Sequence, residues 1–274
     1  MENNNYLYID SSEDKVDKTR QSRFVIPKTN KIDHLIDEEN YSEALLMIEK
    51  TLKKDDVNYW LLKSEIYGKQ NEYEKSIDSI NHALNIDESD EIKTSKANTL
   101  YKWAKVSYFP ELEYEKALEF VENALKILPE SEDPSEFYFL KGEILEALRE
   151  PVEARKSYLI AYKEFNKLEE FENQVEYLNT TEDTLINISG SYFYNFTPSD
   201  SMIVDLVKED DNEHDPDAIA VYYENEKIGY VANSDYTLID EVKSASKIKN
   251  SLNDNAQAKI LFVYLDQYII AKVL

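Results

Sequence analysis

The chain has 274 residues, of which 56 are Asp or Glu and 31 are Lys or Arg, so its formal net charge is −25. The length favours two domains, and a hydrophobic content of 42% is sufficient for packed cores. The absence of Cys excludes disulfides, thiolate metal sites and cysteine nucleophiles, and a total of 4 Gly excludes the glycine-rich loops that bind nucleotide phosphates.

The charge and the hydropathy pattern restrict the surroundings and the partners of the chain. No charge-free apolar run approaches the ~18 residues of a membrane span, and residues 1–10 lack the pattern of a signal peptide. We therefore expect a cytoplasmic protein with no membrane partner. Nucleic acid is bound mainly through Lys and Arg that neutralise phosphates, so this acidic chain can bind it only at a local basic or stacking site. Basic protein segments are the easier partners.

Residues 1–29 are polar and mixed in charge, and we interpret them as a flexible N-terminal tail.

From about residue 30 a pattern recurs, in which a small residue is followed by a bulky one four positions later and usually by Ala three positions further on. The small residues, separated by 32, 41 and 37 positions, are Ala44, Ser76, Ala117 and Ala154. Each copy of the pattern predicts the second helix of a helical hairpin.

The helices expected before these segments place a small residue between large ones on one face, with Ser64 in one repeat and Gly142 in another. A small residue there lets the paired helix cross closely. The pattern resembles tetratricopeptide repeats, whose period is about 34 residues, over residues 30–165. Additional residues around Val106–Leu112 predict a longer turn in the third of four repeats. The alternative is an all-α bundle without repeat geometry.

An apolar helical face follows the fourth repeat. It is formed by Leu168, Phe171, Val175 and Leu178. A solenoid of stacked hairpins needs such a helix to cover its exposed end. We therefore expect residues 30–181 to form an all-α solenoid domain that ends in a capping helix.

In stacked helical hairpins the first helices line a concave groove. The groove residues expected from their positions are Leu61, Glu65, Phe139, Glu143 and Glu146. Apolar anchors mixed with carboxylates suit a basic or amphipathic segment, so we expect a protein or peptide partner in this groove. The alternative is that the groove is only a solvated surface.

The last part of the chain changes to short segments rich in β-branched and aromatic residues. The expected strands are Ile188–Tyr194, Met202–Lys208, Ala218–Tyr223, Lys227–Val231, Ile260–Leu265 and Tyr268–Leu274. A helix is expected at Ser234–Lys249, and a two-residue hairpin turn at Asp266 and Gln267. Six strands and one helix predict a small closed β-barrel at 187–274. The whole chain is therefore expected to be a two-domain α+β protein.

Three ordered segments of this region carry a family resemblance. They are Gly190 with the aromatics Tyr192 and Phe193, then LVKEDDNEHDPDAIAV at 206–221, then KIGYV at 227–231. Together they resemble a HIRAN domain. The resemblance implies binding of single-stranded DNA at a free 3′ end, with aromatic rings stacked on the terminal bases and an Asp at the terminal hydroxyl. Carried over by position, Tyr192 and Phe193 are the stacking pair and Asp215 is the hydroxyl partner.

The implied nucleic-acid site also includes Asn212, His214, Tyr230, Lys243 and Lys247. The two lysines are four positions apart on the expected helix. Where the DNA-binding members carry Arg, an aromatic residue and basic residues, this chain has Ser191, His214, Ala232 and Asn233. Residues 185–274 contain 7 Lys, no Arg and 15 Asp or Glu, a net charge of −8. Carboxylates in place of phosphate contacts weaken DNA binding, so the alternative is a barrel that binds only protein.

The polar residues of the middle segment also have a structural interpretation. Asn212 and Asp215 can hydrogen-bond to nearby backbone and pin a turn. The carboxylates at Glu209–Asp217 do not fit the spacing of an EF-hand loop, and a looser metal site at His214, Asp215 and Asp217 is kept as an alternative. No residues form a catalytic or cofactor-binding pattern, so we expect a non-catalytic adaptor without a cofactor.

Overall fold

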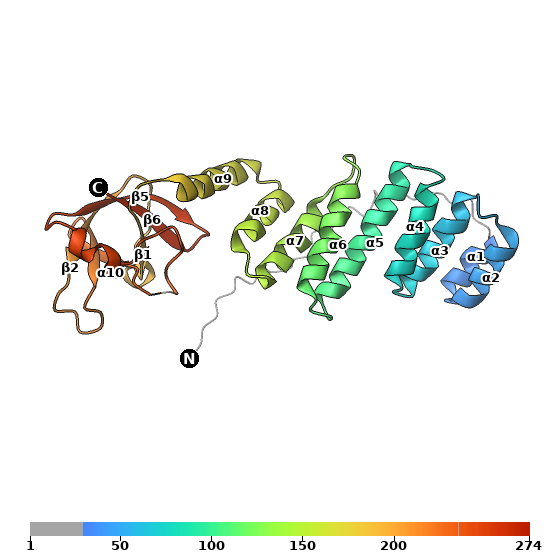
Figure 1. Ribbon diagram of the computed structural model, residues 1–274, viewed down its shortest axis with the longest axis horizontal. Coiled ribbons are helices and arrows are strands. Elements are labelled where there is room, and N and C mark those ends of the chain that lie inside the picture. Colours follow the sequence, from blue (N-terminus) through green and yellow to red (C-terminus); the bar gives the residue numbers. More distant parts are fainter. Residues whose placement is uncertain (1–29, 235) are drawn as a thin grey trace. The chain divides into compact units, whose positions relative to one another are not determined.

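The computed structural model describes residues 30–274 except residue 235 (Figure 1), and the predicted tail at 1–29 lies outside the described residues. The chain divides into two compact units, with the boundary after Thr99. The expected boundary between solenoid and barrel, at 181–187, falls inside the second unit and stays a prediction. Within the described part of the chain, no helix combines the length and the apolar composition needed to span a membrane.

The first unit consists of helical hairpins. Its helices are α1 (Asn30–Asp37), α2 (Tyr41–Thr51), α3 (Val57–Lys69), α4 (Tyr73–Leu84) and the first half of α5 (Asp90–Tyr108). The predicted repeat positions lie in its core, since Ala44 and Ser76 are buried. The hydroxyl of Ser76 donates to the backbone oxygen of Ser64 at 2.9 Å, so α3 and α4 meet at the small residues. The predicted close crossing is confirmed.

The second unit begins with the same kind of hairpin. Its helices after the remainder of α5 are α6 (Tyr114–Ile127), α7 (Ser135–Ala147), α8 (Pro151–Ala161) and α9 (Phe165–Thr180). The small repeat residues Ala117 and Ala154 are buried as predicted. A Cβ atom on Gly142 would lie 2.6 Å from the ring of Tyr158, so the missing side chain allows α8 to pack this closely on α7.

The third repeat is longer than the others both in its first helix and in the turn that follows. Its additional residues lengthen α5, which has 19 residues and ends at Tyr108. Ser107 is buried, and the ring of Tyr108 contacts that of Tyr114 on α6 with a centroid distance of 5.9 Å. These contacts hold the first of the extra residues in the helix. The remaining ones, at 109–113, form a longer connection than those within the other hairpins, so the predicted longer turn is confirmed but begins after Tyr108.

Six strands of the described residues close into an antiparallel barrel (Figure 1). They are β1 (Leu185–Ser189), β2 (Ile203–Lys208), β3 (Ile219–Tyr223), β4 (Glu226–Val231), β5 (Gln257–Tyr264) and β6 (Tyr268–Val273), in the order β1-β4-β3-β2-β5-β6 around the barrel. Alternate residues of β2, Val204 and Leu206, point into the core together with Ile219 and Val221 of β3. The predicted closed barrel is confirmed.

Gly229 lies at a close approach between two strands of the barrel. Its φ is +157°, and a Cβ atom on it would lie 2.5 Å from the backbone oxygen of Ser189 on β1. The pairing of β3 with β4 also shifts in register between Val221 and Tyr222. The expected bulge or close backbone approach at this glycine is therefore confirmed.

Two local predictions in the barrel were wrong in detail. The first strand does not continue to Tyr194, because Gly190 has a φ of +77° and turns the chain into the 3-10 helix η1 (Ser191–Tyr194). The pairing of Tyr264 with Tyr268 leaves a turn of three residues in the last hairpin, Leu265, Asp266 and Gln267. The turn therefore contains the predicted Asp266 and Gln267 pair but is one residue longer, with φ values of 51° and 58° at Leu265 and Asp266.

The predicted helix at Ser234–Lys249 was wrong for most of its length. The helical part is limited to α10 (Ala245–Ile248) and the following 3-10 turn η2 (Lys249–Ser251). The residues before α10 bond to β1 instead: the amide of Lys243 donates to the oxygen of Leu185 at 2.8 Å. The side chain of Asn187 likewise donates to the oxygen of Thr237 at 2.7 Å. These long-range bonds replace the helical ones.

The expected capping helix α9 packs against the barrel. Phe171 stacks on Tyr264 of β5 with a centroid distance of 5.5 Å and an interplanar angle of 16°. Tyr177 meets Phe262 edge-on at 6.2 Å. The apolar face of α9 therefore shares one hydrophobic cluster with barrel residues.

Candidate ligand-binding sites

The turn that follows β1 presents two aromatic side chains to solvent. We call η1 with Gly190 the aromatic turn. The amide of Phe193 donates to the oxygen of Gly190 at 3.0 Å, which closes the turn. The exposed fractions of Tyr192 and Phe193 are 86% and 83%, and their rings lie edge to face at 6.0 Å. Both rings are thus free to stack on a flat ligand.

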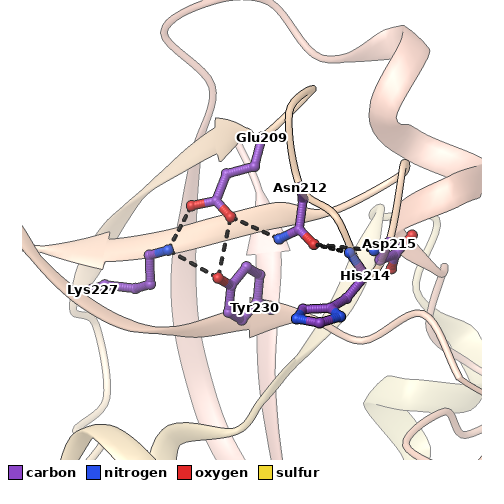
Figure 2. Close-up of polar contacts among 6 residues, drawn as sticks. All are labelled: Glu209, Asn212, His214, Asp215, Lys227 and Tyr230. Carbon is purple, nitrogen blue, oxygen red and sulfur yellow. Dashed lines mark hydrogen bonds and ion pairs between the residues drawn. The ribbon is translucent and has the colours of Figure 1, made fainter.

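Beside this turn, a carboxylate collects three hydrogen-bond donors (Figure 2). The ammonium of Lys227 donates to Oε1 of Glu209 at 2.5 Å. The hydroxyl of Tyr230 and the amide of Asn212 donate to its Oε2 at 3.1 and 3.0 Å. Lys227 also donates to the hydroxyl oxygen of Tyr230 at 2.9 Å. We call these four residues the Glu209 network; it joins the segment after β2 to β4.

The ionisation of these groups reflects their pairing. The hydrogen bond to Glu209 raises the pKa of Lys227, and the bond to Tyr230 adds to this effect. The hydrogen bond from Lys227 lowers the pKa of Glu209. Burial, and then the neighbouring Tyr230, raise the pKa of Tyr194, which belongs to the aromatic turn. The network therefore extends to the edge of that turn.

Asp215 is held by its neighbours on the same face of the barrel. The side-chain oxygen of Asn212 accepts hydrogen bonds from the amides of His214 and Asp215, each at 3.0 Å. The carboxylate of Asp215 accepts from the amide of Asp217 at 2.9 Å and from the side chain of Asn233 at 2.9 Å. The prediction that Asn212 and Asp215 pin a turn is confirmed.

The metal alternative finds no support in this geometry. Among residues 30–274 without residue 235, no group of three or more His, Cys, Asp or Glu side chains could hold a metal ion. The backbone amide and Asn233 bonds of Asp215 account for its orientation, while His214 is exposed. His214, Asp215 and Asp217 are therefore neighbours in a turn whose hydrogen bonds are made within the chain.

The lysines of the barrel are arranged differently from the prediction. Lys243 precedes α10 and Lys247 lies within it, so the two do not share a helical face; both are exposed. Lys249 is buried, and its ammonium donates to the oxygen of Pro216 at 2.6 Å and pairs with Asp210 at 2.8 Å. Lys249 therefore fixes η2 to the segment after β2 and is not free to bind a ligand.

Sequence reasoning missed Glu209 and Lys227 as a pair. They are 18 positions apart, and the β3–β4 hairpin brings them together. The signal available in the sequence was that Glu209 directly follows β2 and Lys227 lies near the start of β4, on either side of β3.

In the second unit, α7 and α8 carry a mixed aromatic and acidic surface. Phe139 is 39% exposed and lies edge-on to Tyr158 and Tyr162, at centroid distances of 5.6 and 6.1 Å. The hydroxyl of Tyr158 donates to Glu146 at 3.0 Å. Burial raises the pKa of Glu143, against a smaller opposite effect of Lys105. We call Phe139, Glu143, Glu146, Tyr158 and Tyr162 the aromatic–carboxylate surface.

The other two predicted groove residues lie in the first unit. Leu61 is buried, 7% exposed, in a hydrophobic cluster with Ile80, Ala83 and Ile92, so its side chain serves packing. Glu65 is exposed on α3. Of the predicted groove residues, the structure brings together Phe139, Glu143 and Glu146.

Comparisons with known proteins agree with the C-terminal resemblance. Residues 182–247 match the family model of the HIRAN domain, so the chain carries a HIRAN domain that includes the aromatic turn and the Glu209 network. A comparison with curated proteins gave no match. Two solved structures, "Crystal structure of MamA" and "Crystal structure of MamA protein", are similar to 52% of this chain, each with 19% identity and a TM-score of 0.36; the similarity covers 78% and 74% of those chains.

Proposed function

We propose that the chain is a non-catalytic adaptor, in which the HIRAN domain binds a single-stranded nucleic-acid end and the helical repeats hold a segment of another protein. The observation that carries the first part is the aromatic turn, where Tyr192 and Phe193 are 86% and 83% exposed. Stacking of a base on an aromatic ring contributes ~1–3 kcal/mol and needs no particular base sequence. Two adjacent exposed rings suit two successive unpaired bases.

Asp215 supports recognition of a free 3′ end. Its carboxylate is oriented by Asn233 and by the amide of Asp217. A carboxylate oxygen has further lone pairs, so Asp215 can accept a hydrogen bond from a terminal hydroxyl. A 3′ phosphate at the same position would bring negative charge against this carboxylate and be repelled.

Fluorescence anisotropy with a 5′-labelled oligothymidylate tests this part. We expect saturable binding of the free 3′ hydroxyl form below ~100 μM at low salt, and weaker binding of the 3′ phosphate form. The double variant Tyr192→Ala, Phe193→Ala should bind at least about tenfold more weakly, since each lost stacking contact is worth ~1–3 kcal/mol. Tyr236→Ala is the control, because Tyr236 is 95% exposed outside the aromatic turn. Absence of saturable binding contradicts the nucleic-acid part.

A specific observation favours a second candidate function for the barrel, namely protein binding alone. Lys227 and Lys249 are both paired with carboxylates, and the region from 185 to the end has a net charge of −8. Few cations are then left for phosphates. Under this alternative the oligonucleotide does not bind, and Tyr192 and Phe193 are needed to retain a protein partner in co-purification.

The repeat part of the proposal rests on the aromatic–carboxylate surface. A Lys or Arg side chain of a partner can place its cation over the ring of Phe139 or Tyr162 while Glu143 or Glu146 supplies the opposite charge. Burial disfavours the charged form of Glu143, and a partner's cation would reverse that effect. A basic or amphipathic segment is therefore the favoured occupant.

Peptide titrations test this part with matched variants. The probe is a labelled 12-residue peptide of alternating Lys and Leu, compared with its Glu-for-Lys counterpart. Glu143→Gln with Glu146→Gln should weaken binding of the Lys peptide severalfold. Glu169→Gln with Glu172→Gln, an exposed pair of the same spacing on α9, should leave it unchanged. Equal effects of the two double variants contradict the surface assignment.

A further inference from the structure

The Glu209 network has the composition of an anion-binding site. An ammonium, a phenol hydroxyl and a side-chain amide, from Lys227, Tyr230 and Asn212, converge on a single carboxylate. Carboxylate and phosphate oxygens accept hydrogen bonds from the same donors, and Lys binds phosphate as a point charge. The position that an oxygen of a ligand would take beside Lys227 is occupied by the chain's own Glu209 (Figure 2).

This position is accessible from solvent and adjoins the aromatic turn. The side chains of Lys227 and Glu209 are each 25% exposed. Strand β4, which carries Lys227 and Tyr230, contacts the aromatic turn. In the proposed binding mode, a nucleic-acid strand whose bases stack on Tyr192 and Phe193 thus runs beside the Glu209 network.

We propose that Glu209 is a specificity-determining residue of this HIRAN domain, because it occupies the oxygen-binding position at Lys227 and excludes a nucleic-acid phosphate from it. The inference rests on the proposed nucleic-acid binding and deepens it. The domain selects its ligand by base stacking, while Lys227 contributes no phosphate contact. The chain's own carboxylate makes the site selective against densely charged ligands.

Glu209 competes well with an external phosphate for two reasons. It is part of the same chain, so its contact with Lys227 needs no association step. A phosphate that displaced it would also deprive the carboxylate of its bonds from Tyr230 and Asn212, leaving a half-buried charge without donors. Removing the charge of Glu209, without changing its shape, should therefore open the position to phosphate.

Glu209→Gln is the decisive variant, tested with the full chain and the 5′-labelled oligothymidylate. One additional phosphate contact on a single strand makes the negative slope of log Kobs against log[salt] steeper by ~0.7. This corresponds to about eightfold tighter binding at ~50 mM salt. We expect both changes in Glu209→Gln. Adding Lys227→Met should abolish both, because the contact requires the ammonium.

Glu226→Gln is the matched control for net charge. Glu226 is exposed and adjacent to Lys227 on β4, and its replacement changes the charge of the chain by the same amount. Glu226→Gln should keep the salt slope of the wild type. A slope and affinity in Glu209→Gln equal to those of Glu226→Gln overturn the inference, whether or not the wild type binds through its aromatic turn.

A titration with inorganic phosphate separates this inference from the proposed function. The NMR signals of the Lys227 side chain and the Tyr230 ring are followed in the wild type and in Glu209→Gln. Shifts that saturate in the variant alone support the inference even where no oligonucleotide binds to either protein. Absence of shifts in a folded Glu209→Gln, as judged by circular dichroism, overturns it.

Discussion

Replacing Gly229 with Ala adds one methyl group where β4 approaches β1. The new Cβ atom would lie 2.5 Å from the backbone oxygen of Ser189 and 3.2 Å from Cγ2 of Ile188. A backbone oxygen in a paired strand cannot rotate aside as a side chain can, so β1 and β4 must separate. The φ of Gly229, +157°, is also one that L side chains rarely adopt.

The two effects define the expected magnitude. Backbone strain of this kind costs ~1–3 kcal/mol and overpacking a further ~1–3 kcal/mol, so Gly229→Ala should destabilise the barrel by ~2–6 kcal/mol. The barrel belongs to the compact unit Leu100–Leu274, and in a unit of that size a loss of 1 kcal/mol lowers Tm by about 2–4 °C, which predicts unfolding ~4–24 °C below the wild type. The assay is thermal unfolding followed by near-ultraviolet circular dichroism.

Gly190→Ala is the control for backbone strain alone. Gly190 has a φ of +77°, but the nearest atom to a Cβ there, on Phe193, lies 4.0 Å away. This variant should lose only ~1–2 kcal/mol. A Tm for Gly229→Ala within 2 °C of the wild type, or above that of Gly190→Ala, would refute the reasoning that β1 and β4 are held rigidly together.

Three further outcomes are expected. Phe171→Ala should destabilise the second unit by ~3–5 kcal/mol in urea unfolding, because Phe171 is 6% exposed and stacks on the barrel, whereas Phe165→Ala, at a residue 59% exposed, should have little effect. The hydrogen bond from Lys163 holds the pKa of Asp133 at about 2, so Lys163→Met should raise it toward the ordinary ~3.9 in an NMR titration. The folded-state pKa of Glu209 is lowered, so the ionised carboxylate stabilises the fold above its ordinary pKa. This stabilisation is lost as the pH falls through the folded-state pKa. The free energy of unfolding of Glu209→Gln, measured against pH, should therefore lack this decrease.

The helical repeats and the barrel could be predicted because their signals are local. The small residues Ser64 and Gly142 mark helix crossings that depend only on spacing along two neighbouring helices. Alternation of apolar residues such as Val204 and Leu206 similarly marks a strand with one buried face. In both cases the residues that decide the structure lie within one strand or one helical hairpin.

The segment before α10 could not be predicted in this way. Its apolar residues have helical spacing, but Lys243 bonds to Leu185 and Thr237 to Asn187, about 50 positions or more away. Such long-range bonds leave no periodic trace in the sequence.

The candidate site was predicted only in part for the same reason. The aromatic pair Tyr192 and Phe193 and the turn at Asn212 are contiguous features, and the sequence indicates them directly. The pairing of Glu209 with Lys227 depends on the register of the β3–β4 hairpin, which shifts by one residue on β4 between Gly229 and Lys227. A one-residue shift changes the face on which a side chain lies, so the sequence alone could not assign the pair.

The most direct measurement follows the ring signals of the exposed aromatics by NMR while an oligothymidylate with a free 3′ hydroxyl is added to the full chain. Stacking on the aromatic turn should shift the ring signals of Tyr192 and Phe193 upfield until they saturate, and leave those of Tyr236 in place. Unchanged ring signals at saturating oligonucleotide, or equal shifts at Tyr236, would contradict the account.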